Sequence, residues 1–183
     1  MKHFDRMAAG VAMCMVLAMM GCGGSQQPSP RVQVWDEDTV EEVSLSADKV
    51  VVPFTPKGGG CMEIQASLNG EPFNMLWDTG AAITSISALE LQKLDKAGKI
   101  TLDDLQGTIV AQIADGSYTE EYVFNLAEIV IPARDNQSLT LHDIEVCVSA
   151  NMSAPLLVGQ NVMRKLPRHT IDNAESVIIF EQQ

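Results

Sequence analysis

The run "FNMLWDTGAAITSIS" places one carboxylate, Asp78, directly after the apolar residues Met75, Leu76 and Trp77. Aspartate is a poor strand residue and is costly to bury, so its position at the end of an apolar run needs a reason. In one interpretation its side chain caps the backbone of a turn before Gly80. In the other it is a working carboxylate in a polar niche, able to take up or donate a proton during a reaction.

Other residues with reactive side chains do not form a recognisable site. His3, His142 and His169 are far apart and lack the spacing of metal ligands, so we expect no metal. No Gly-x-Ser-x-Gly surrounds Ser85 or Ser87, which argues against a serine hydrolase. The stretch "PKGGGC" lacks the Lys-Ser/Thr ending of a phosphate-binding loop and is better explained as a flexible turn. We therefore predict no metal and no cofactor, which leaves Asp78 as the main candidate.

A second segment, "PLLVGQNVM", follows "FNMLWDTGA" about eighty residues later. Together the two segments resemble the retropepsin-like aspartic proteases, including their bacterial envelope members. The family pattern is an apolar run, Asp-Thr/Ser-Gly-Ala, a flap hairpin, and an apolar-apolar-Gly segment that opens a short helix. The resemblance spans roughly residues 58–180. It implies an all-β fold, a retropepsin-like acid protease barrel with one or two short helices. Trp77 and Ala82 depart from the residues usual at their positions.

The resemblance also implies roles for single residues. Asp78 would be the catalytic acid and base. The Thr79 hydroxyl would hydrogen-bond to Thr79 of a second copy and to neighbouring backbone. Gly80 would offer backbone contacts to a substrate and Ala81 would line the pocket, with Gly159 supporting them. The tip of the flap that closes over a peptide would be formed by Ala114, Asp115, Gly116 and Ser117. For Asp115-Gly116 an ordinary surface hairpin explains the residues equally well.

Peptide hydrolysis by water needs a base for the water and an acid for the carbonyl oxygen or leaving nitrogen. Two carboxylates a few ångströms apart can supply both, because they share one proton and their pKa values split. The chain has one Asp-Thr-Gly, and Gly159 has no acid beside it. A homodimer that brings two copies of Asp78 together on a two-fold axis would complete the site. The terminal run Val177 to Phe180 either pairs with a second copy or completes the chain's own sheet.

The elements that must position Asp78 are short strands separated by turns. Hairpin turns are predicted at Asn69-Gly70, Asp115-Gly116 and Asp172-Asn173. A helix is expected over "ALELQKLDKAG", ending at Gly98, and a short helical turn after Gly159. The chain shows no alternation of strands with long helices, which favours a mostly β domain.

Composition limits the partners. A length of 183 residues suits one ordinary domain with appendages, and 46% apolar residues suit a real core. The formal net charge is -12, so nucleic acid is excluded as a partner because phosphate binding needs clustered Lys and Arg. The resemblance implies a peptide or protein substrate instead.

Residues 1–21 are predicted to be a lipoprotein signal peptide. Lys2 and Arg6 give a weakly positive start, and Met7 to Met20 has the apolar length of a signal and is short for a membrane-spanning helix. The following "AMMGC" resembles the bacterial lipobox, which implies that Cys22 carries the lipid. An ordinary cleaved signal and an uncleaved anchor are the alternatives. The resemblance implies a protein of the bacterial cell envelope, lipid-anchored to a membrane and facing the periplasm or the exterior.

Residues 22–48 are predicted to be a flexible tether and acidic lead-in, and residues 49–183 the retropepsin-like domain. Within that domain only Cys61 and Cys147 remain for pairing. An export signal implies an oxidising compartment where a disulfide persists, so we predict a bridge between them. Because each cysteine lies in an apolar, strand-like run, two buried free thiols are the alternative.

Three functional classes fit these observations. The first is an aspartic endopeptidase whose water is activated by a two-Asp dyad in a homodimer. The second is a catalytically weak or inactive lipoprotein of the same fold that acts as a peptide- or partner-binding module. The third is a structural lipoprotein whose hairpins only pack. Asp78→Asn separates the first class from the others, because it should abolish cleavage and leave folding intact.

Overall fold

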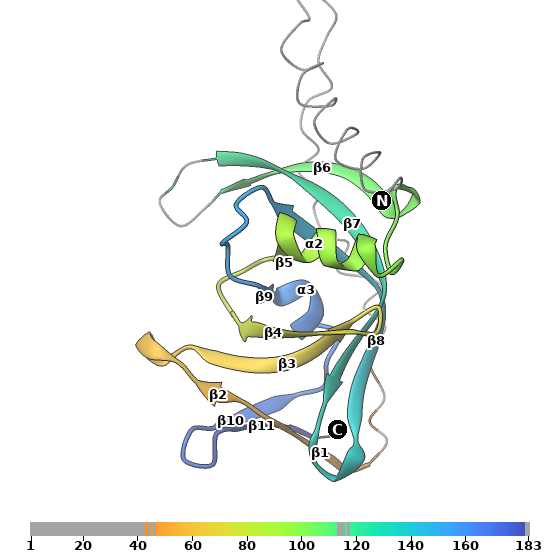
Figure 1. Cartoon of the computed structure of the whole chain (residues 1–183). Helices are drawn as coiled ribbons and strands as arrows, with labels where there is room; N and C mark the ends of the chain where they lie inside the picture. The colour runs from red at the N-terminus through yellow and green to blue at the C-terminus, as the bar shows by residue number, and fades with distance from the viewer. Residues whose placement is uncertain (1–42, 44, 46, 113–115, 117, 182–183) are drawn as a thin grey trace, which may run out of the picture.

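The computed structural model describes residues 43, 45, 47–112, 116 and 118–181. These residues form two β-sheets (Figure 1). The larger sheet has the strand order β2-β3-β4-β9-β5-β8-β7-β6, and an additional pairing of β3 with β7 curls it back on itself; the smaller sheet has the order β1-β11-β10. The predicted all-β fold with short helices is confirmed. The elements are β1 (Lys49–Pro53), β2 (Thr55–Pro56), β3 (Met62–Leu68), β4 (Glu71–Trp77), β5 (Thr84–Ser87), α2 (Ala88–Lys96), β6 (Leu105–Gln112), β7 (Tyr118–Pro132), β8 (Ser138–Ser149), β9 (Leu157–Val158), α3 (Gln160–Met163), β10 (His169–Asp172) and β11 (Val177–Glu181), with 3-10 turns at Gly58–Gly60, Leu102–Asp104 and Arg134–Asn136.

The hairpin of β3 and β4 turns at Asn69-Gly70, as predicted. Both residues have positive φ angles, 48° and 89°, which Asn and Gly adopt more easily than other residues. The Asn69 side chain fastens the turn: its Nδ2 donates to the Lys99 carbonyl at 2.7 Å and its Oδ1 accepts from the Glu128 N–H at 2.9 Å. With its far end held in this way, β4 carries the chain to Asp78 along a fixed path.

Helix α2 begins directly after β5 and covers part of the core. Ser87 is its N-cap, with Oγ accepting from the Leu89 N–H and donating to the carboxylate of Glu90. The buried residues Leu91 and Leu94 lie three apart, on one face of the helix. Gly98 follows the helix with a φ of 68°, so it ends the helix as predicted.

Strands β6 and β7 form the second predicted hairpin. Strand β7 is long and pairs with β6 along one part and with β8 along the other, sharing Tyr122 to Phe124 between both pairings. A bulge at Leu105–Gly107, where Gly107 has a φ of 141°, bends the start of β6. The hairpin arches over β9 and α3, and the Tyr118 end of β7 lies on the same side of the molecule as the loop that leaves β4 (Figure 1).

Strand β11 lies in the middle of the smaller sheet. Phe180 pairs with Val50 of β1 on one side and with His169 of β10 on the other. Both hydrogen-bonding edges of β11 are therefore used within the chain, and Phe180 is fully buried. Of the two alternatives for Val177 to Phe180, the structure supports the second: the run completes the chain's own sheet.

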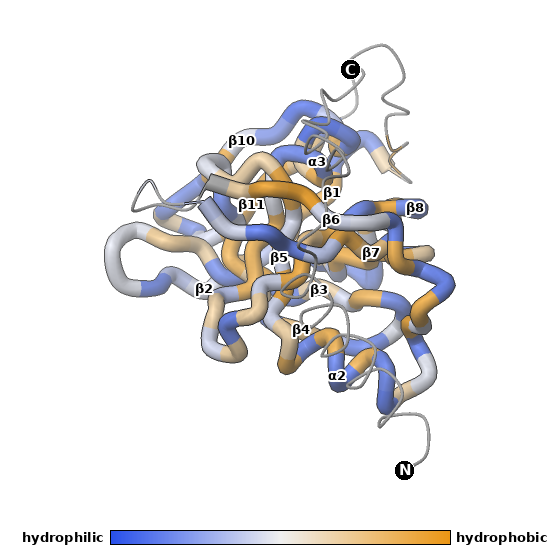
Figure 2. The backbone as a smooth tube through the Cα atoms, turned by 90° about the horizontal axis from the view of Figure 1, so that it is seen from above, coloured by the Kyte–Doolittle hydropathy of each residue, from blue (hydrophilic) through white to orange (hydrophobic). Residues whose placement is uncertain are grey.

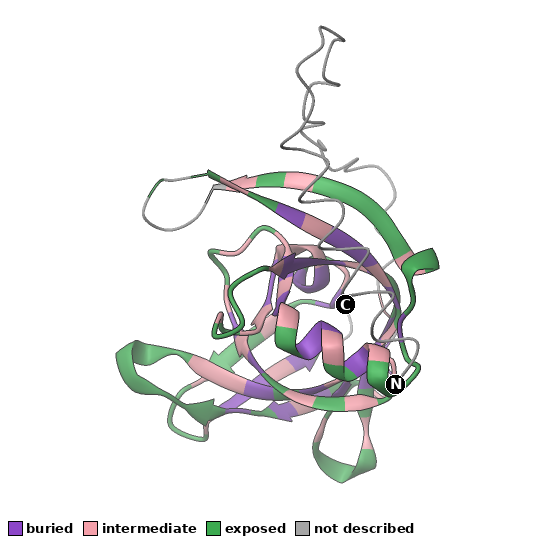
Figure 3. Cartoon of the chain, turned by 45° about the horizontal axis from the view of Figure 1, so that its top comes forward, coloured by how far each residue is buried: buried purple, intermediate pink, exposed green. Residues whose placement is uncertain are grey.

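The two sheets share one hydrophobic core. Residues of both sheets belong to the same cluster of buried side chains, for example Ile64 and Met75 from the larger sheet and Ile178 and Phe180 from the smaller. Apolar residues follow the strands and polar residues the turns (Figure 2). The buried residues lie along the inner strands and on one side of α2 (Figure 3). Along each strand buried and exposed residues tend to alternate, because the two-residue period of a strand turns every second side chain inward.

The predicted disulfide is not formed. Cys61 is exposed just before β3, Cys147 is buried on β8, and both thiols are free. The neighbours of β8 are β5 and β7, so β3 and β8 do not pair with each other. The prediction was wrong because alternation in the sequence identifies strands without showing which strands are neighbours.

The predicted signal peptide, Cys22 and most of the tether lie outside the described residues. Val43 donates its N–H to the Lys165 carbonyl at 2.8 Å, and Leu45 is buried in the core, so contacts with the folded body begin before Lys49. In the part of the chain that the structure describes, no helix is long and apolar enough to cross a membrane.

Candidate active site

Asp78 lies at the end of β4, in a turn that its own side chain stabilises. Its N–H donates to the Val158 carbonyl at 3.1 Å, which extends the pairing of β4 with β9. Its Oδ1 accepts from the Gly80 N–H at 2.8 Å, the contact expected of an Asx-turn. Within the described residues Oδ2 accepts no hydrogen bond, and the side chain is only half-buried. The turn therefore leaves one carboxylate oxygen available for chemistry, so the two interpretations of Asp78 are compatible.

The loop after Asp78 is hydrogen-bonded to the segment after β9. The Ala81 and Ala82 carbonyls accept from the N–H groups of Gln160 and Asn161 at 2.9 and 3.1 Å. The Gln160 side chain donates to the Thr79 carbonyl at 2.9 Å. These three bonds join segments about eighty positions apart in the sequence, so the loop has little freedom to move away from the segment.

Gly159 stands where these two segments come closest. A Cβ atom added to it would lie 2.5 Å from the carbonyl carbon of Ile83 and 2.7 Å from its oxygen. No side chain fits at that separation, since the contacting atoms are backbone. We call the place where the Asp78 loop meets the segment after β9 the crossing. The glycine of "LLVGQN" is required there, and it lies beside the Asp78 loop.

A buried polar network lies directly beneath the crossing. The Asn161 Oδ1 accepts from both the N–H and the hydroxyl of Thr84 at 2.8 Å, and its Nδ2 donates to the Glu145 carbonyl at 2.7 Å. The Thr84 hydroxyl in turn accepts from the Gly159 N–H at 3.1 Å. Sequence reasoning missed Thr84 and Asn161. The available signal was a polar residue at the start of a buried strand and another two residues after Gly159.

The structure brings Asp78, Thr79, Gly80, Ala81 and Gly159 together at one place. Thr79 and Gly80 are exposed, whereas Ala81 is half-buried and Gly159 is buried. Within the described residues the Thr79 hydroxyl makes no hydrogen bond, so in a single chain it is free to bond elsewhere.

Only one residue of the predicted flap tip is described. Gly116 is exposed and has a φ of 85°. Ala114, Asp115 and Ser117 lie outside the described residues. Beside the tip, the strand residues Val110 and Tyr118 are 47% and 71% exposed, so this end of the hairpin projects into solvent.

Trp77, the residue before Asp78, packs against two aromatic rings of the smaller sheet. Its ring is 5% exposed and meets the rings of His169 and Phe180 edge-on, with centroids 5.5 and 6.1 Å away. Its Nε1 is buried and has no hydrogen-bond partner among the residues that the structure describes. Burial lowers the pKa of His169 below its ordinary value, and a backbone hydrogen bond at Pro167 opposes the effect in part. The large residue before Asp78 is thus accommodated because the smaller sheet supplies aromatic neighbours for it.

A row of paired residues leads away from Asp78 across the larger sheet. Leu76 pairs with Leu157, Leu157 with Ser85, Ser85 with Cys147, and Cys147 with Val123. We call these five residues the site wall. Paired residues on neighbouring strands point to the same face, and this face is opposite to that of the core residues Trp77, Ile86 and Val148. Sequence reasoning did not identify the wall, because its members come from five strands.

Burial changes the character of the wall's cysteine. The pKa of Cys147 is raised to about 12, chiefly by burial and then by the nearby charges of Glu121 and Glu145. The thiol therefore stays protonated at neutral pH and packs as a small apolar side chain.

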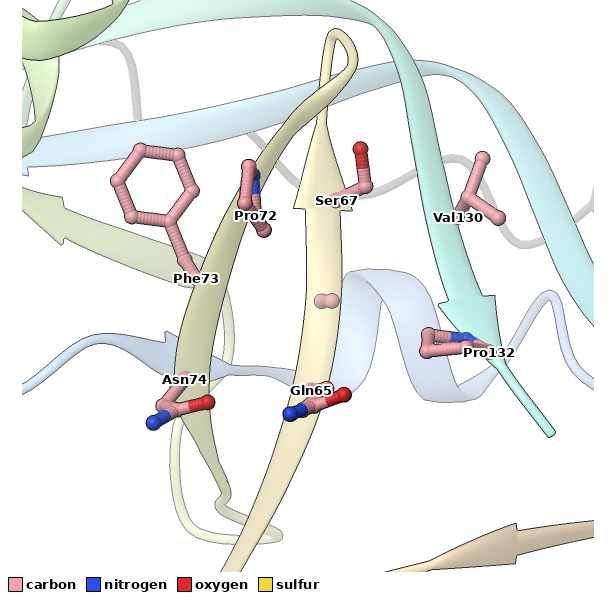
Figure 4. Close-up of a pocket in the computed structure, with 8 residues that line it drawn as sticks. Gln65, Ser67, Pro72, Phe73, Asn74, Val130 and Pro132 are labelled. Carbon is pink, nitrogen blue, oxygen red and sulfur yellow. The ribbon is translucent and has the colours of Figure 1, made fainter.

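A separate hollow of about 310 Å³ lies on the outside of the large sheet (Figure 4). It does not include Asp78. The hollow is lined by Gln65, Ala66, Ser67, Pro72, Phe73, Asn74, Val130 and Pro132, from β3, β4 and β7. No group of three or more potential metal ligands occurs among the described residues.

Known proteins provide two points of comparison. The sequence matches the family described as "gag-polyprotein putative aspartyl protease" over residues 64–165, more than half of the chain. No curated protein matches. A solved structure, a retropepsin-like aspartic protease from Rickettsia conorii, superposes with a TM-score of 0.50 at 17% sequence identity, covering 75% of this chain and 93% of that one. At this identity the superposition shows a shared fold. The chain therefore belongs to the gag-polyprotein aspartyl protease family and has the retropepsin-like fold that its paired Asp-Thr-Gly and Gly159 segments predicted.

Proposed function

We propose that the protein is an aspartic endopeptidase that acts as a homodimer, in which each subunit contributes one Asp78 to a two-carboxylate site. The observation that carries the proposal is the crossing of the Asp78 loop with the Gly159 segment. It holds a carboxylate with one uncommitted oxygen at a fixed place while Thr79 and Gly80 remain exposed. An exposed Thr79–Gly80 tip is the part of each chain that a second Asp78 loop would meet on a two-fold axis.

In the proposed reaction the two carboxylates start with one proton between them. The ionised carboxylate takes a proton from water as the water oxygen bonds to the carbonyl carbon, and the protonated one gives its proton to the carbonyl oxygen. Collapse of this tetrahedral species breaks the C–N bond as a proton passes to the leaving nitrogen. The products are a carboxylic acid and an amine, and the carboxylates return to their starting state. No electron transfer and no cofactor are involved.

The remaining residues of the site have positioning roles in this proposal. The Thr79 hydroxyl bonds across the dimer axis, Gly80 and Ala81 contact the substrate backbone, and Gly159 permits the crossing. Ala114, Asp115, Gly116 and Ser117 close over an extended peptide and add main-chain hydrogen bonds.

The experiment that tests the proposal is a peptide-library cleavage assay from acidic to neutral pH. Wild-type protein should cleave peptides and Asp78→Asn should not, while both unfold at the same urea concentration. Asp103→Asn, at an exposed position of the Leu102–Asp104 turn, is the matched control and should retain activity. Cleavage that survives in Asp78→Asn would exclude an aspartic mechanism through this residue.

A binding module is the second candidate. The β6–β7 hairpin, whose end projects into solvent, suits an extended peptide whether or not a bond is cut. A protein that dimerises and binds peptides, but whose turnover is absent in wild type and Asp78→Asn alike, would favour this candidate.

We also propose that Cys22 is lipidated and anchors the domain to a membrane of the bacterial cell envelope, with the domain facing the periplasm or the exterior. The support is the signal-like run Met7 to Met20 followed by "GC". Cys22→Ala should leave the precursor unprocessed or release the protein from the membrane fraction. A mature N-terminus without lipid in the mass spectrum would contradict this assignment.

A further inference from the structure

The turn between α3 and β10 carries a basic patch. It consists of Arg164, Lys165 and Arg168, three of the chain's 12 Lys and Arg residues within five positions. Arg164 and Arg168 are exposed and Lys165 is half-buried, while Leu166 and Pro167 between them are buried and hold the turn against the folded body. Because the chain has a net charge of -12, this concentration of positive charge runs against its overall composition.

The patch has no acidic partner in the part of the chain that the structure describes. Its three side chains form no ion pair there, whereas Lys57, for comparison, pairs with Glu63 at 2.9 Å. Glu181 comes near, since its N–H donates to the Arg168 carbonyl at 3.1 Å, but its exposed carboxylate forms no ion pair with the patch. The positive charge is therefore available to carboxylates from outside the described residues.

The chain joins the folded body at this patch. The Val43 N–H donates to the Lys165 carbonyl at 2.8 Å, and Leu45 is buried in the core. Residues 36–42, directly before Val43, read "DEDTVEE" and contain five carboxylates and no Lys or Arg. They lie outside the described residues, but the bond of Val43 limits their distance from the patch. At roughly 3.5 Å per residue, the farthest of them is within about 25 Å of Lys165.

We propose that residues 36–42 dock on the patch of Arg164, Lys165 and Arg168, so that the acidic lead-in is clamped to the body of its own chain. Opposite charges attract, and the covalent link keeps the segment at a high effective concentration beside the patch. Anionic lipid headgroups are the other source of negative charge for such a patch. They are disfavoured because the chain's net charge of -12 repels an anionic surface.

The clamp links the tether to the supports of the candidate site. The turn that carries the patch connects α3, whose N–H groups hold the Asp78 loop, to β10, whose histidine meets the Trp77 ring. Tying residues 36–42 to this turn therefore ties the tether to both supports. With Cys22 as the proposed lipid anchor, docking leaves only residues 23–35 as a spacer. The greatest reach from the anchor to the body then falls from roughly 70 Å to roughly 45 Å.

The test is zero-length cross-linking of the full chain with a carbodiimide, which joins a carboxylate to a lysine amine where the two are in contact. At low salt, peptide mapping should find the Lys165 amine joined to Asp36, Glu37 or Asp38. The bond of Val43 alone does not bring these three into contact with the patch, since they lie five or more positions before it. About 1 M NaCl should lower the yield severalfold, because the Debye length falls to about 3 Å.

Charge reversal tests whether the patch holds the segment. Arg164→Glu combined with Arg168→Glu should lower the yield roughly threefold to tenfold, the size expected when a few exposed ion pairs are lost. The urea midpoint should not change, since both side chains are exposed. Arg134→Glu, at an exposed arginine of the Arg134–Asn136 turn, is the matched control and should keep the yield, as should Glu181→Gln.

Three outcomes overturn the inference. The first is the absence of a cross-link from Lys165 to Asp36, Glu37 or Asp38 at low salt. The second is a yield that the double charge reversal leaves unchanged, because proximity would then come from the tether alone. The third, in place of the cross-link, is a preference for phosphatidylglycerol over phosphatidylcholine vesicles that the double reversal removes, which assigns the patch to lipid headgroups. None of these measurements depends on peptide cleavage, so they stand apart from the test of the proposed protease function.

Discussion

Single residues far apart in the sequence fix the position of Asp78. Thr84 and Asn161, 77 positions apart, share two hydrogen bonds, and the Thr84 hydroxyl accepts a third from the Gly159 N–H. Gly159 also provides the space in which the two segments meet. Each contact joins the two motifs that the sequence presents separately. The position of the Asp78 carboxylate therefore depends on both the Asp78 loop and the Gly159 segment. A substitution that disrupts either segment should displace Asp78.

Gly159→Ala is expected to disrupt this crossing. The added methyl would press on the Ile83 backbone, which cannot rotate away as a flexible side chain would. We expect a loss of on the order of 1–3 kcal/mol in the free energy of unfolding, measured by urea titration, together with loss of peptide cleavage. Gly58→Ala is the control, because nothing lies within 4 Å of a Cβ atom at that position. Equal stability of the two variants would show that the crossing adjusts without strain.

His169 should make folding stability depend on pH. Burial lowers its pKa in the folded state from the ordinary 6.5, so the unfolded chain binds a proton that the folded chain resists. Stability should therefore fall as the pH drops from about 6.5 toward the lowered pKa and then level off. Thermal unfolding at about pH 7.5 and about pH 5 should show a smaller difference in Tm for His169→Gln than for wild type. His142→Gln, at an exposed histidine of β8, should leave the difference as it is. An unchanged difference in His169→Gln would remove this histidine as the cause.

At the scale of elements, the part of the fold that could be predicted from the sequence is the part with local signals. The turn at Asn69-Gly70, the helix between Ser87 and Gly98 and the hairpin of β6 and β7 depend on residues close together in the chain. The turn at Asp78 also depends on residues close together in the chain, since the Asp78 Oδ1 accepts from the Gly80 N–H.

What could not be predicted is which strands are neighbours. Hydrophobic alternation shows that Cys147 and Val123 lie on strands, but the pairing that builds the site wall is decided by packing of the whole sheet. The same limit explains the incorrect disulfide between Cys61 and Cys147, and it is why the sequence left open whether Val177 to Phe180 pairs within its own chain. The Thr84–Asn161 network was missed for this reason too, since its partners meet only after the strands have assembled.

Phe180→Ala tests the internal position of β11. Phe180 is fully buried and meets the Trp77 ring, so truncation should cost roughly 3–5 kcal/mol of unfolding free energy in a urea titration. The loss should be the same at low and high protein concentration, because β11 is enclosed within one chain. Ile171→Ala, at a 39% exposed position of β10, is the control and should cost less than about 1 kcal/mol. A concentration-dependent loss would place Phe180 at an interface between copies.

At the scale of the whole molecule, one chain folds around a single core and carries half of the proposed two-carboxylate site. Both sheets share a core, β11 has no free edge, and yet a single Asp78 is present. Under the proposed function, we therefore expect the monomer to fold by itself and peptide cleavage to require a second copy.

The proposed dimer makes a prediction for mixtures. At low concentration the activity of wild-type protein should rise with the square of its concentration, because two chains supply one site. An excess of Asp78→Asn added to a fixed amount of wild type should lower the activity, since mixed dimers hold one carboxylate; an excess of Asp103→Asn should not. Full activity from a species that is monomeric by ultracentrifugation would overturn the shared dyad.

The middle position of β11 also affects how the protein is made. Among the described strands β11 comes last in the sequence, whereas its partner β1 comes first. Until β11 arrives, β1 and β10 each lack a neighbour, and Trp77 lacks the Phe180 ring behind the Asp78 loop. A chain that has been made only as far as β10 therefore lacks the Phe180 ring that contacts Trp77. The candidate site therefore gains its full aromatic support only once β11 has been synthesised and has folded against Trp77.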